Sequence, residues 1–280
     1  MSETLVASDW ANERGKKWCD DLPCMEAMLV FVDAPLIEAL QLDRPLRIAD
    51  IGCGGGGTTL EILAHAPAGS CVHGFDISQD LVELARTRIR AGDGNIAFHL
   101  ADVGSAMTPL MPYDRLVSRF GIMFFDNPAQ AFANLACWLA PGGRFAFAVW
   151  GPRADNPWIT GFSDAVGGII DAPPPDREAP GPLRYGGGET LLALLDAAGL
   201  SDLGISDWRG LIPLGGGLSV PDTVDFTLNS VSASDLLVGA DETTLSEIRQ
   251  RLKAHYTPYE RDGAVWMDGR IHIVTGRSPA

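Results

Sequence analysis

Short apolar runs alternate with amphipathic stretches between residues 46 and 150. A short apolar run occupies residues 46–52, further stretches of strand length and strand character occupy 71–78, 96–103, 113–121 and 144–150, and helical periodicity occupies residues 58–66, 79–92 and 127–140. A short run that is apolar at nearly every position is typical of a strand buried on both faces of a sheet. The alternation therefore predicts βαβ units and a mostly parallel sheet covered by helices on both faces.

The rhythm changes after residue 150. We expect helices at 156–170 and 188–200, a strand at 201–210 and a closing strand at 269–277. Residues 211–262 read as a glycine-rich connection followed by two helices, inserted between the last two strands. The sequence thus predicts a doubly wound α/β domain with a seven-stranded sheet, formed by residues 46–210 and 263–280, and a helical cap for substrate at 211–262.

Residues 1–45 are expected to form an N-terminal helical segment. Apolar residues recur there at helical spacing over 8–44, and Pro35 is expected to mark the break between two helices. The apolar stretch 22–42 is a candidate homodimer face.

Charge and composition exclude several classes of partner. The chain of 280 residues has a formal net charge of −15, and its Lys and Arg residues form no cluster. Binding to nucleic acid or to an anionic membrane requires a basic surface, so neither partner is expected. The start of the chain lacks a signal-peptide pattern and no apolar run reaches membrane-spanning length, which together predict a cytoplasmic protein.

The stretch "IADIGCGGGGTTL" (48–60) places a glycine-rich loop between an expected strand and an expected helix. Gly52, Gly54 and Gly57 satisfy the dinucleotide pattern G-x-G-x-x-G, and Asp50 with Gly52, Gly54 and Gly56 satisfies D-x-G-x-G-x-G, which is typical of S-adenosylmethionine sites. The loop contains no lysine, which excludes a P-loop.

Three acids at or near the ends of successive expected strands help to separate the two cofactors. Asp76 follows the second strand, where an acid accepts hydrogen bonds from ribose hydroxyls in either kind of site, and Asp102 follows the third. Asp50 discriminates between them, because a carboxylate opposes a pyrophosphate but suits the ammonium group of a methionine. An NAD(P)-dependent oxidoreductase remains the alternative at this point.

The chain resembles the class I S-adenosylmethionine-dependent methyltransferases. "ADIGCGGG", "GFDIS", "LADV" and "LAPGGRFAF" are similar to four motifs of that family, over about residues 46–150. "VSRFGIMFFDNPAQAFANL" (117–135), "WANERGKKW" (10–18) and "NPW" (156–158) resemble a bacterial subgroup related to the C-methyltransferases of ubiquinone and menaquinone synthesis. The stretch 211–262 departs from the quinone enzymes.

The resemblance implies a set of residues that bind S-adenosylmethionine. Asp50, Gly52 and Gly54 would hold its methionine part, and Arg119 would face the same amino acid portion. The remaining implied contacts are Asp76 with the ribose, Ile77 with the adenine face, Asp102 and Val103 with the adenine edge, and Trp18 closing over the site.

The substrate side offers an apolar wall and no clear catalytic base. Phe120, Met123 and Trp158 are expected to line the pocket, and His255 and Tyr259 are weak candidates for a base. No metal is expected, because the acids near the fourth strand form no cluster. We predict methyl transfer to carbon or oxygen of an apolar, cyclic or aromatic small molecule; the alternatives are the oxidoreductase or a non-methylating relative, such as a cyclase or scaffold, that keeps the cofactor.

Overall fold

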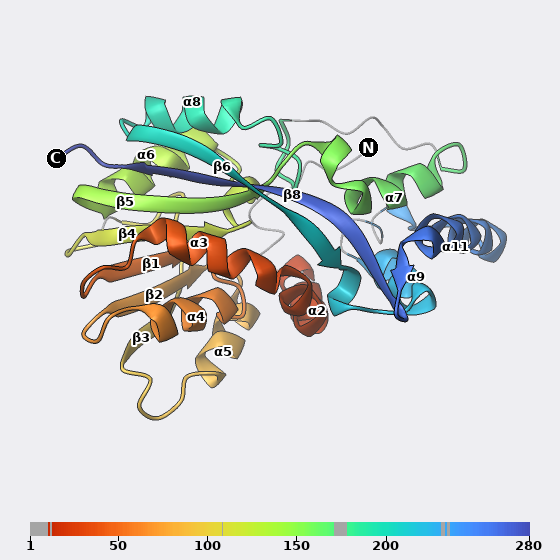
Figure 1. Ribbon diagram of the computed structural model, residues 1–280, viewed down its shortest axis with the longest axis horizontal. Helices are drawn as coiled ribbons and strands as arrows, with labels where there is room; N and C mark the ends of the chain where they lie inside the picture. The colour runs from red at the N-terminus through yellow and green to blue at the C-terminus, as the bar shows by residue number, and fades with distance from the viewer. Residues whose placement is uncertain (1–10, 12, 108, 171–177, 231–232, 234–235) are drawn as a thin grey trace.

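A mixed β-sheet forms one half of the molecule and a group of helices forms the other (Figure 1). The structure, a computed structural model, describes residues 11, 13–107, 109–170, 178–230, 233 and 236–280. The first ten residues of the N-terminal segment, with Trp10 of the "WANERGKKW" stretch, lie outside this described part.

The sheet has the predicted doubly wound arrangement. Its strands are β1 (Arg47–Ile51), β2 (Cys71–Asp76), β3 (Asn95–Leu100), β4 (Tyr113–Arg119), β5 (Leu139–Trp150), β6 (Ser201–Pro213) and β8 (Ala264–Arg277), with a two-residue strand β7 (Glu260–Arg261). They follow the order β3-β2-β1-β4-β5-β8-β6, and β7 pairs with β8 off this path. Neighbours among β1 to β5 are parallel, whereas β8 runs antiparallel to both β5 and β6. The predicted fold class, a mostly parallel Rossmann-like sheet, is confirmed.

Helices cover both faces of the sheet (Figure 1). The helices α3 (Asp33–Leu40), α4 (Gly57–His65) and α5 (Gln79–Thr87) lie on one face, and α6 (Pro128–Trp138) and α8 (Glu189–Ala197) lie on the other. Local chemistry fixes two of their starts, because the side chains of Ser78 and Asn127 accept hydrogen bonds from backbone N–H groups in the first turns of α5 and α6. Strand β1 is buried between the two helix layers, as its continuous apolar run predicts.

Several element boundaries differ from those predicted, and three of the differences concern the N-terminal helices, α5 and β5. The N-terminal break lies at η1 (Val30–Val32), between α2 (Glu13–Leu29) and α3, while Pro35 is the third residue of α3, where no intrahelical N–H is needed. Helix α5 ends at Thr87 instead of residue 92, because the Asp93 carboxylate takes the Arg90 N–H out of the helical ladder. Strand β5 begins at Leu139, with an irregular register opposite Tyr113 and Gly142 in a left-handed conformation at φ 70°.

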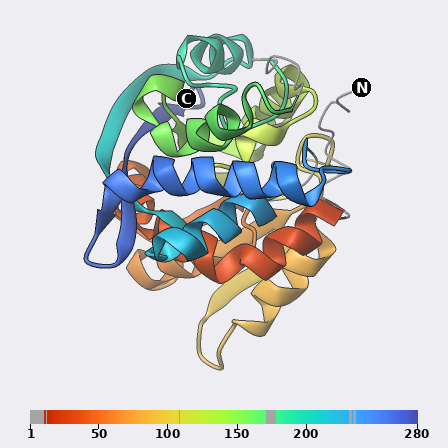
Figure 2. The same cartoon turned by 90° about the vertical axis from the view of Figure 1, so that its right-hand side faces the viewer.

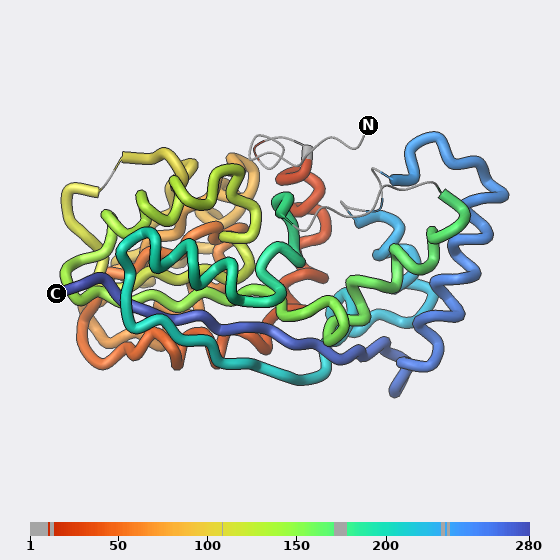
Figure 3. Tube along the Cα trace, turned by 90° about the horizontal axis from the view of Figure 1, so that it is seen from above, coloured from red at the N-terminus to blue at the C-terminus, as the bar shows by residue number. Residues whose placement is uncertain are grey.

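The second half of the molecule is built from helices around the far ends of β6 and β8. Between those strands lie η4 (Leu214–Gly216), α9 (Val220–Asn229), α11 (Glu242–Tyr256) and η5 (Thr257–Tyr259). Helix α11 packs against α9 and against α7 (Pro157–Val166), which follows the short turn η3 (Arg153–Asp155) (Figure 2). Helix α2 lies between the two halves and contacts η4 (Figure 3). No helix in the described ranges has both the length and the apolar character needed to cross a bilayer.

Candidate functional site

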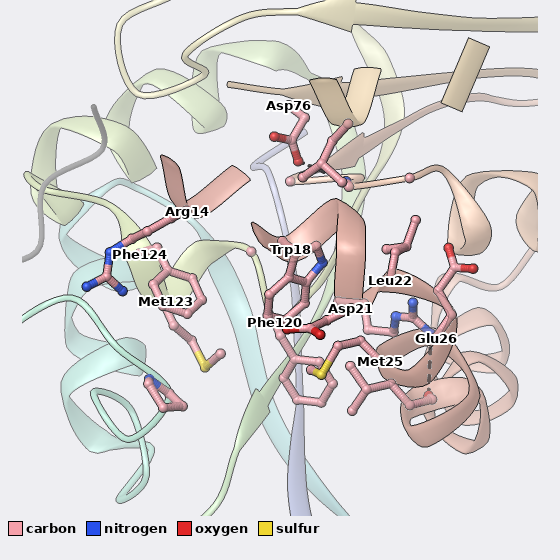
Figure 4. A pocket seen from close by; sticks show the side chains of 18 of the residues that line it. Arg14, Trp18, Asp21, Leu22, Met25, Glu26, Asp76, Phe120, Met123 and Phe124 are labelled. Atoms are coloured by element: carbon pink, nitrogen blue, oxygen red, sulfur yellow. Dashed lines mark hydrogen bonds between the residues drawn. The ribbon is translucent and has the colours of Figure 1, made fainter. Parts of the chain in front are cut away.

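A cavity of about 390 Å³ opens at the carboxyl ends of the parallel strands, within the size range of small-molecule sites (Figure 4). The loops after β1, β2 and β3 and the end of β4 form one side of it. Helix α2 contributes a second wall, and α7, α9 and the end of α11 contribute further lining residues. Of the predicted site residues, the cavity brings together Trp18, Asp50, Gly52, Gly54, Asp76, Ile77, Asp102, Val103, Arg119, Phe120, Met123 and Trp158.

The glycine loop bends sharply because every second residue is left-handed. Gly52, Gly54 and Gly56 have φ values of 68°, 54° and 82°, a region that L side chains rarely adopt. A Cβ at Gly52 would lie 2.9 Å from the Cα of Gly121, the residue that follows Phe120. A Cβ at Gly54 would meet no atom within 4 Å, so at this point the loop leaves open space where a ligand can approach the backbone.

The other glycines of the run make room for helix α2. A Cβ on Gly55 would lie 2.3 Å from Cδ2 of Leu22, and one on Gly57 would lie 2.8 Å from Oε1 of Glu26. Arg88, at the end of α5, donates to both carboxylate oxygens of Glu26 at 2.6 and 3.1 Å and to the carbonyl of Gly55 at 2.9 Å. The four consecutive glycines thus serve both the bend of the loop and the close approach of α2.

Asp50 is a buried carboxyl at the end of β1. It is 1% exposed, and its Oδ2 accepts a hydrogen bond of 2.7 Å from the hydroxyl of Thr59 in α4. Burial raises the pKa of Asp50 from 3.8 to about 7, and the Thr59 hydrogen bond and Arg119 only partly oppose this shift. The protein thus compensates the negative charge of the Asp50 carboxylate only in part. A cationic group placed beside Asp50 would form a favourable interaction with that charge.

Asp76 and Asp102 are held by backbone N–H groups. Asp76 accepts from Gly54 N at 2.8 Å and from Ser78 N at 2.9 Å; burial raises the pKa of Asp76, while these hydrogen bonds lower it. Asp102 lies two residues beyond the end of β3 and accepts from Gly104 N at 2.9 Å and Ser105 Oγ at 2.7 Å. Strand β3 was predicted to reach residue 103, but it ends at Leu100, so this acid sits in a turn.

Arg119 belongs to a buried polar network that the sequence did not reveal. Its guanidinium donates to Asp33 Oδ2 at 3.0 Å, and Thr58 donates to the other oxygen of Asp33 at 2.8 Å. Burial raises the pKa of Asp33, although Arg119 and Thr58 lower it. The available signal was Asp33 inside the apolar stretch "VFVDAPLI", because an acid is expensive to bury without a cationic partner.

The far side of the cavity is aromatic. Phe120 has a left-handed backbone with φ 66°, and its ring stacks on Trp150 with centroids 4.4 Å apart. Trp158 meets Trp150 edge to face at 4.7 Å, and Met123 is buried on η2 (Ile122–Phe124). A bulky residue at positive φ is a sparsely populated conformation that surrounding contacts must maintain.

Three polar groups interrupt this apolar wall, and the sequence indicated no role for two of them, Asp21 and Thr227. Asp21 projects from α2, and burial raises the pKa of its carboxyl; within the described ranges it has no hydrogen-bond partner. Tyr256 and Thr227 also line the cavity, with their hydroxyl oxygens 2.9 Å apart. Both belong to the helices between β6 and β8.

The two weak candidates for a base lie elsewhere. His255 and Tyr259 are not among the cavity-lining residues, because the imidazole of His255 packs against α7, where a Cβ on Gly161 would come within 2.6 Å of Nε2. Burial lowers the pKa of His255. Tyr256, the next residue along α11, reaches the cavity in their place.

The charges of the lining side chains indicate which kind of cofactor the cavity fits. Arg14 and Arg119 are the cationic side chains among them, and Arg119 is already paired with Asp33. A pyrophosphate would face Asp50, Asp76 and Asp102 with little compensation, whereas a nucleoside carrying ammonium and sulfonium charges suits these acids. Among the described residues, no group of three His, Cys, Asp or Glu side chains could hold a metal ion.

Comparison with known proteins points the same way. Residues 48–143 match the family described as "Methyltransferase domain". A malonyl-[acyl-carrier protein] O-methyltransferase of Halalkalibacterium halodurans is 30% identical over 113 residues, covering 39% of this chain and 41% of that protein. An aklanonic acid methyltransferase of a Streptomyces species is 31% identical over 102 residues, covering 36% and 46%. The matched part spans less than half the length of these curated relatives.

Structural similarity extends further along the chain than sequence similarity. The YcgJ protein of Bacillus subtilis superposes with a TM-score of 0.59 at 16% identity, covering 90% of this chain and 99% of that one. This likeness concerns the fold alone. The family match, however, overturns the oxidoreductase alternative, because the loop that admitted both cofactors lies inside the matched residues.

Proposed function

We propose that this chain, in which residues 48–143 are a methyltransferase domain and S-adenosylmethionine is the cofactor, methylates carbon or oxygen of an apolar, cyclic or aromatic small molecule. The observation that carries the proposal is the division of one cavity into an acid-lined end beside the glycine loop and an aromatic end beside Phe120.

The proposed cofactor contacts follow the positions of the acids. Asp50 binds the ammonium group of the methionine part, with Gly52 and Gly54 beneath it, and Asp76 uses its remaining lone pairs for the ribose hydroxyls. Ile77 and Val103 pack on the adenine, Asp102 accepts from its amino edge, and Trp18 closes the site from α2. Arg119 offers the carboxylate of the same cofactor a cation that Asp33 holds in place.

S-adenosylmethionine supplies a methyl group already activated by the positive charge on sulfur. The residues of the chain therefore need chiefly to align the acceptor and to exclude water. Phe120, Met123 and Trp158 supply an apolar wall suited to both tasks. Residues 211–262 act in this proposal as the substrate cap, and they contribute Leu214, Phe226, Thr227, Ser230 and Tyr256 to the cavity.

On the basis of the stretch 117–135, we assign the chain to a bacterial subgroup that is related to quinone C-methyltransferases. We do not propose that its substrate is a quinone. The reason is the long insertion at 211–262. A homodimer also remains a prediction; Val30 and Phe31 of η1 are 53% and 40% exposed at the surface of the N-terminal segment.

Isothermal titration with S-adenosylhomocysteine tests the cofactor site. We expect saturable binding that Asp76→Ala weakens at least tenfold, whereas Asp196→Asn, an exposed acid on α8, leaves it unchanged. Failure of the wild type to bind would contradict the proposal. Binding without transfer of labelled methyl to any member of a broad metabolite panel would favour the non-methylating alternative.

A further inference from the structure

We infer that Asp21 accepts the proton of the acceptor group, and that the substrate carries a ring-conjugated hydroxyl, a phenol or an enol. This inference rests on the proposed methyl transfer and names its substrate class and its base.

Asp21 occupies the cavity face of α2. The same cavity is lined by Trp18, three residues before Asp21, and by Leu22 and Met25, one and four residues after it. Because residues at i−3 and i+4 share one helix face, the carboxylate stands in a row with Trp18 and Met25. Figure 4 shows it directed into the cavity toward Phe120 and away from Asp76.

The charges around Asp21 leave its carboxylate available as a proton acceptor. Lys17, one turn earlier, lowers its pKa, while burial and the neighbouring Asp20 raise it. Within the described ranges no side chain or backbone N–H donates to it. The other charged residues that line this cavity are Arg14, Glu26, Asp50, Asp76, Asp102 and Arg119. An unpaired, partly buried carboxylate in a cavity is a common setting for a general base.

The second polar group of the aromatic end also accepts hydrogen bonds. Thr227 Oγ1 lies 2.8 Å from the carbonyl of Thr223, and a carbonyl cannot donate, so the single hydroxyl proton of Thr227 is committed there. The hydrogen bond between Thr227 and Tyr256 therefore takes its proton from Tyr256. Because both hydroxyl protons are used within the protein, Thr227 and Tyr256 can only accept hydrogen bonds from a ligand.

The hydrogen-bond acceptors Asp21 and Tyr256 lie in a wall of aromatic rings. This wall favours a planar substrate that has hydrogen-bond donors. The stacked faces of Phe120 and Trp150, with Trp158 beside them, suit a ring, and Asp21 and Tyr256 require hydroxyl protons on it. A ketone or ether without a hydroxyl would leave both acceptors desolvated and unpaired, which is costly.

The proton balance of the transfer is simple. The acceptor atom of the phenol or enol forms its bond to the methyl carbon, and the electron pair of the broken carbon–sulfur bond stays on sulfur. The hydroxyl proton passes to the carboxylate of Asp21, which releases it to water after the product leaves. No oxidant, reductant or metal is needed.

The test uses 1-naphthol and chloro- or nitro-substituted 1-naphthols of increasing acidity, with labelled methyl donor and the full chain. We expect transfer to the parent naphthol, a loss of about 100-fold in kcat in Asp21→Asn, and a smaller loss as the naphthol becomes more acidic. Asp20→Asn, its exposed neighbour on α2, serves as the matched control and should retain the wild-type rate. Asp21→Glu should restore part of the loss.

Binding separates this inference from the function on which it depends. With S-adenosylhomocysteine bound, titration of 1-naphthol should show at least tenfold tighter binding than that of 1-methoxynaphthalene, and Asp21→Asn should abolish the difference. If S-adenosylhomocysteine binds normally but no naphthol is methylated, or if Asp21→Asn behaves like Asp20→Asn, the inference is wrong and the proposed function stands. Loss of S-adenosylhomocysteine binding in the wild type would remove both.

Discussion

Leu22 of α2 occupies the space that a side chain at Gly55 would need, with its Cδ2 only 2.3 Å from the position of a Cβ there. The conformation of Gly55 is not left-handed, so this glycine is required by its neighbour and not by its backbone. We therefore expect Gly55→Ala to push α2 away from the loop and to weaken S-adenosylhomocysteine binding about tenfold.

The double variant Gly55→Ala/Leu22→Ala should recover most of that loss, because the shortened side chain frees the space; isothermal titration of the three variants measures the coupling. Gly204→Ala, in β6 with only an ordinary 3.5 Å contact, is the control and should bind normally. Equal losses in the single and double variants would show that the clash is not the cause.

Asp50 should make stability and cofactor affinity respond to pH in opposite directions. Its folded-state pKa of about 7 exceeds the ordinary value of 3.8, so the folded chain holds this proton more tightly than the unfolded chain does. The free energy of unfolding should therefore fall as pH rises from 5 to 7. Asp50→Asn cannot ionise, and its stability advantage over wild type should grow by roughly 2 kcal/mol across that window.

Urea unfolding at pH 5, 6, 7 and 8 measures this advantage, and Asp196→Asn provides the comparison. Cofactor binding should show the opposite trend, because an ammonium group beside Asp50 favours the carboxylate form. The affinity of wild type for S-adenosylhomocysteine should rise between pH 6 and 8, and that of Asp50→Asn should be weaker and independent of pH. A flat profile in the wild type would argue against contact with the ammonium group.

The ion pair between Arg88 and Glu26 joins α2 to the glycine loop, and it should contribute a measurable coupling free energy to stability. The two side chains are 29% and 25% exposed and form a two-pronged ion pair, so we expect a coupling free energy of about 1 kcal/mol in a double-mutant cycle of Arg88→Met and Glu26→Gln. The same cycle on Arg249 and Asp225, whose side chains are 53% and 58% exposed, should give less than about 0.5 kcal/mol. Addition of 1 M salt should reduce the first coupling only in part, since partial burial limits screening.

Phe120 offers a test of backbone strain in the wall of the cavity. Because its φ is 66°, Phe120→Gly should be more stable than Phe120→Ala by about 1 kcal/mol, although both lose the stack on Trp150. At Met123, whose φ is negative, the order should reverse and alanine should be the more stable replacement. Thermal unfolding of the four variants decides this, and a higher Tm for Phe120→Ala than for Phe120→Gly would contradict the argument.

The sequence revealed features that are local and missed those that depend on tertiary contact. Asp50 and Asp76 could be placed at the cavity because they are the second-last residue of β1 and the last residue of β2, and parallel strands bring their carboxyl ends to one edge. Asp33 and Asp21 could not, because nothing near them in the chain indicates that α3 meets Arg119 or that α2 crosses the glycine loop. His255 and Tyr256 show the same limit on a finer scale: adjacent helical residues differ by about 100° in direction, and the periodicity of α11 did not decide which of them turns inward.

Strands β6 and β8 are 13 and 14 residues long, and β8 pairs with the parallel strand β5 only over Ile271–Arg277. The rest of β8 pairs with β6 beyond that region, and helices α9 and α11 connect the ends of these two strands. The recognisable family match stops at residue 143, before either strand begins. In the proposed function, most of the cofactor contacts lie inside the matched stretch, whereas residues 211–262, which supply part of the acceptor wall, lie outside it. Exchange of residues 211–262 for those of another chain is accordingly the change that we expect to alter the acceptor while leaving S-adenosylhomocysteine binding intact.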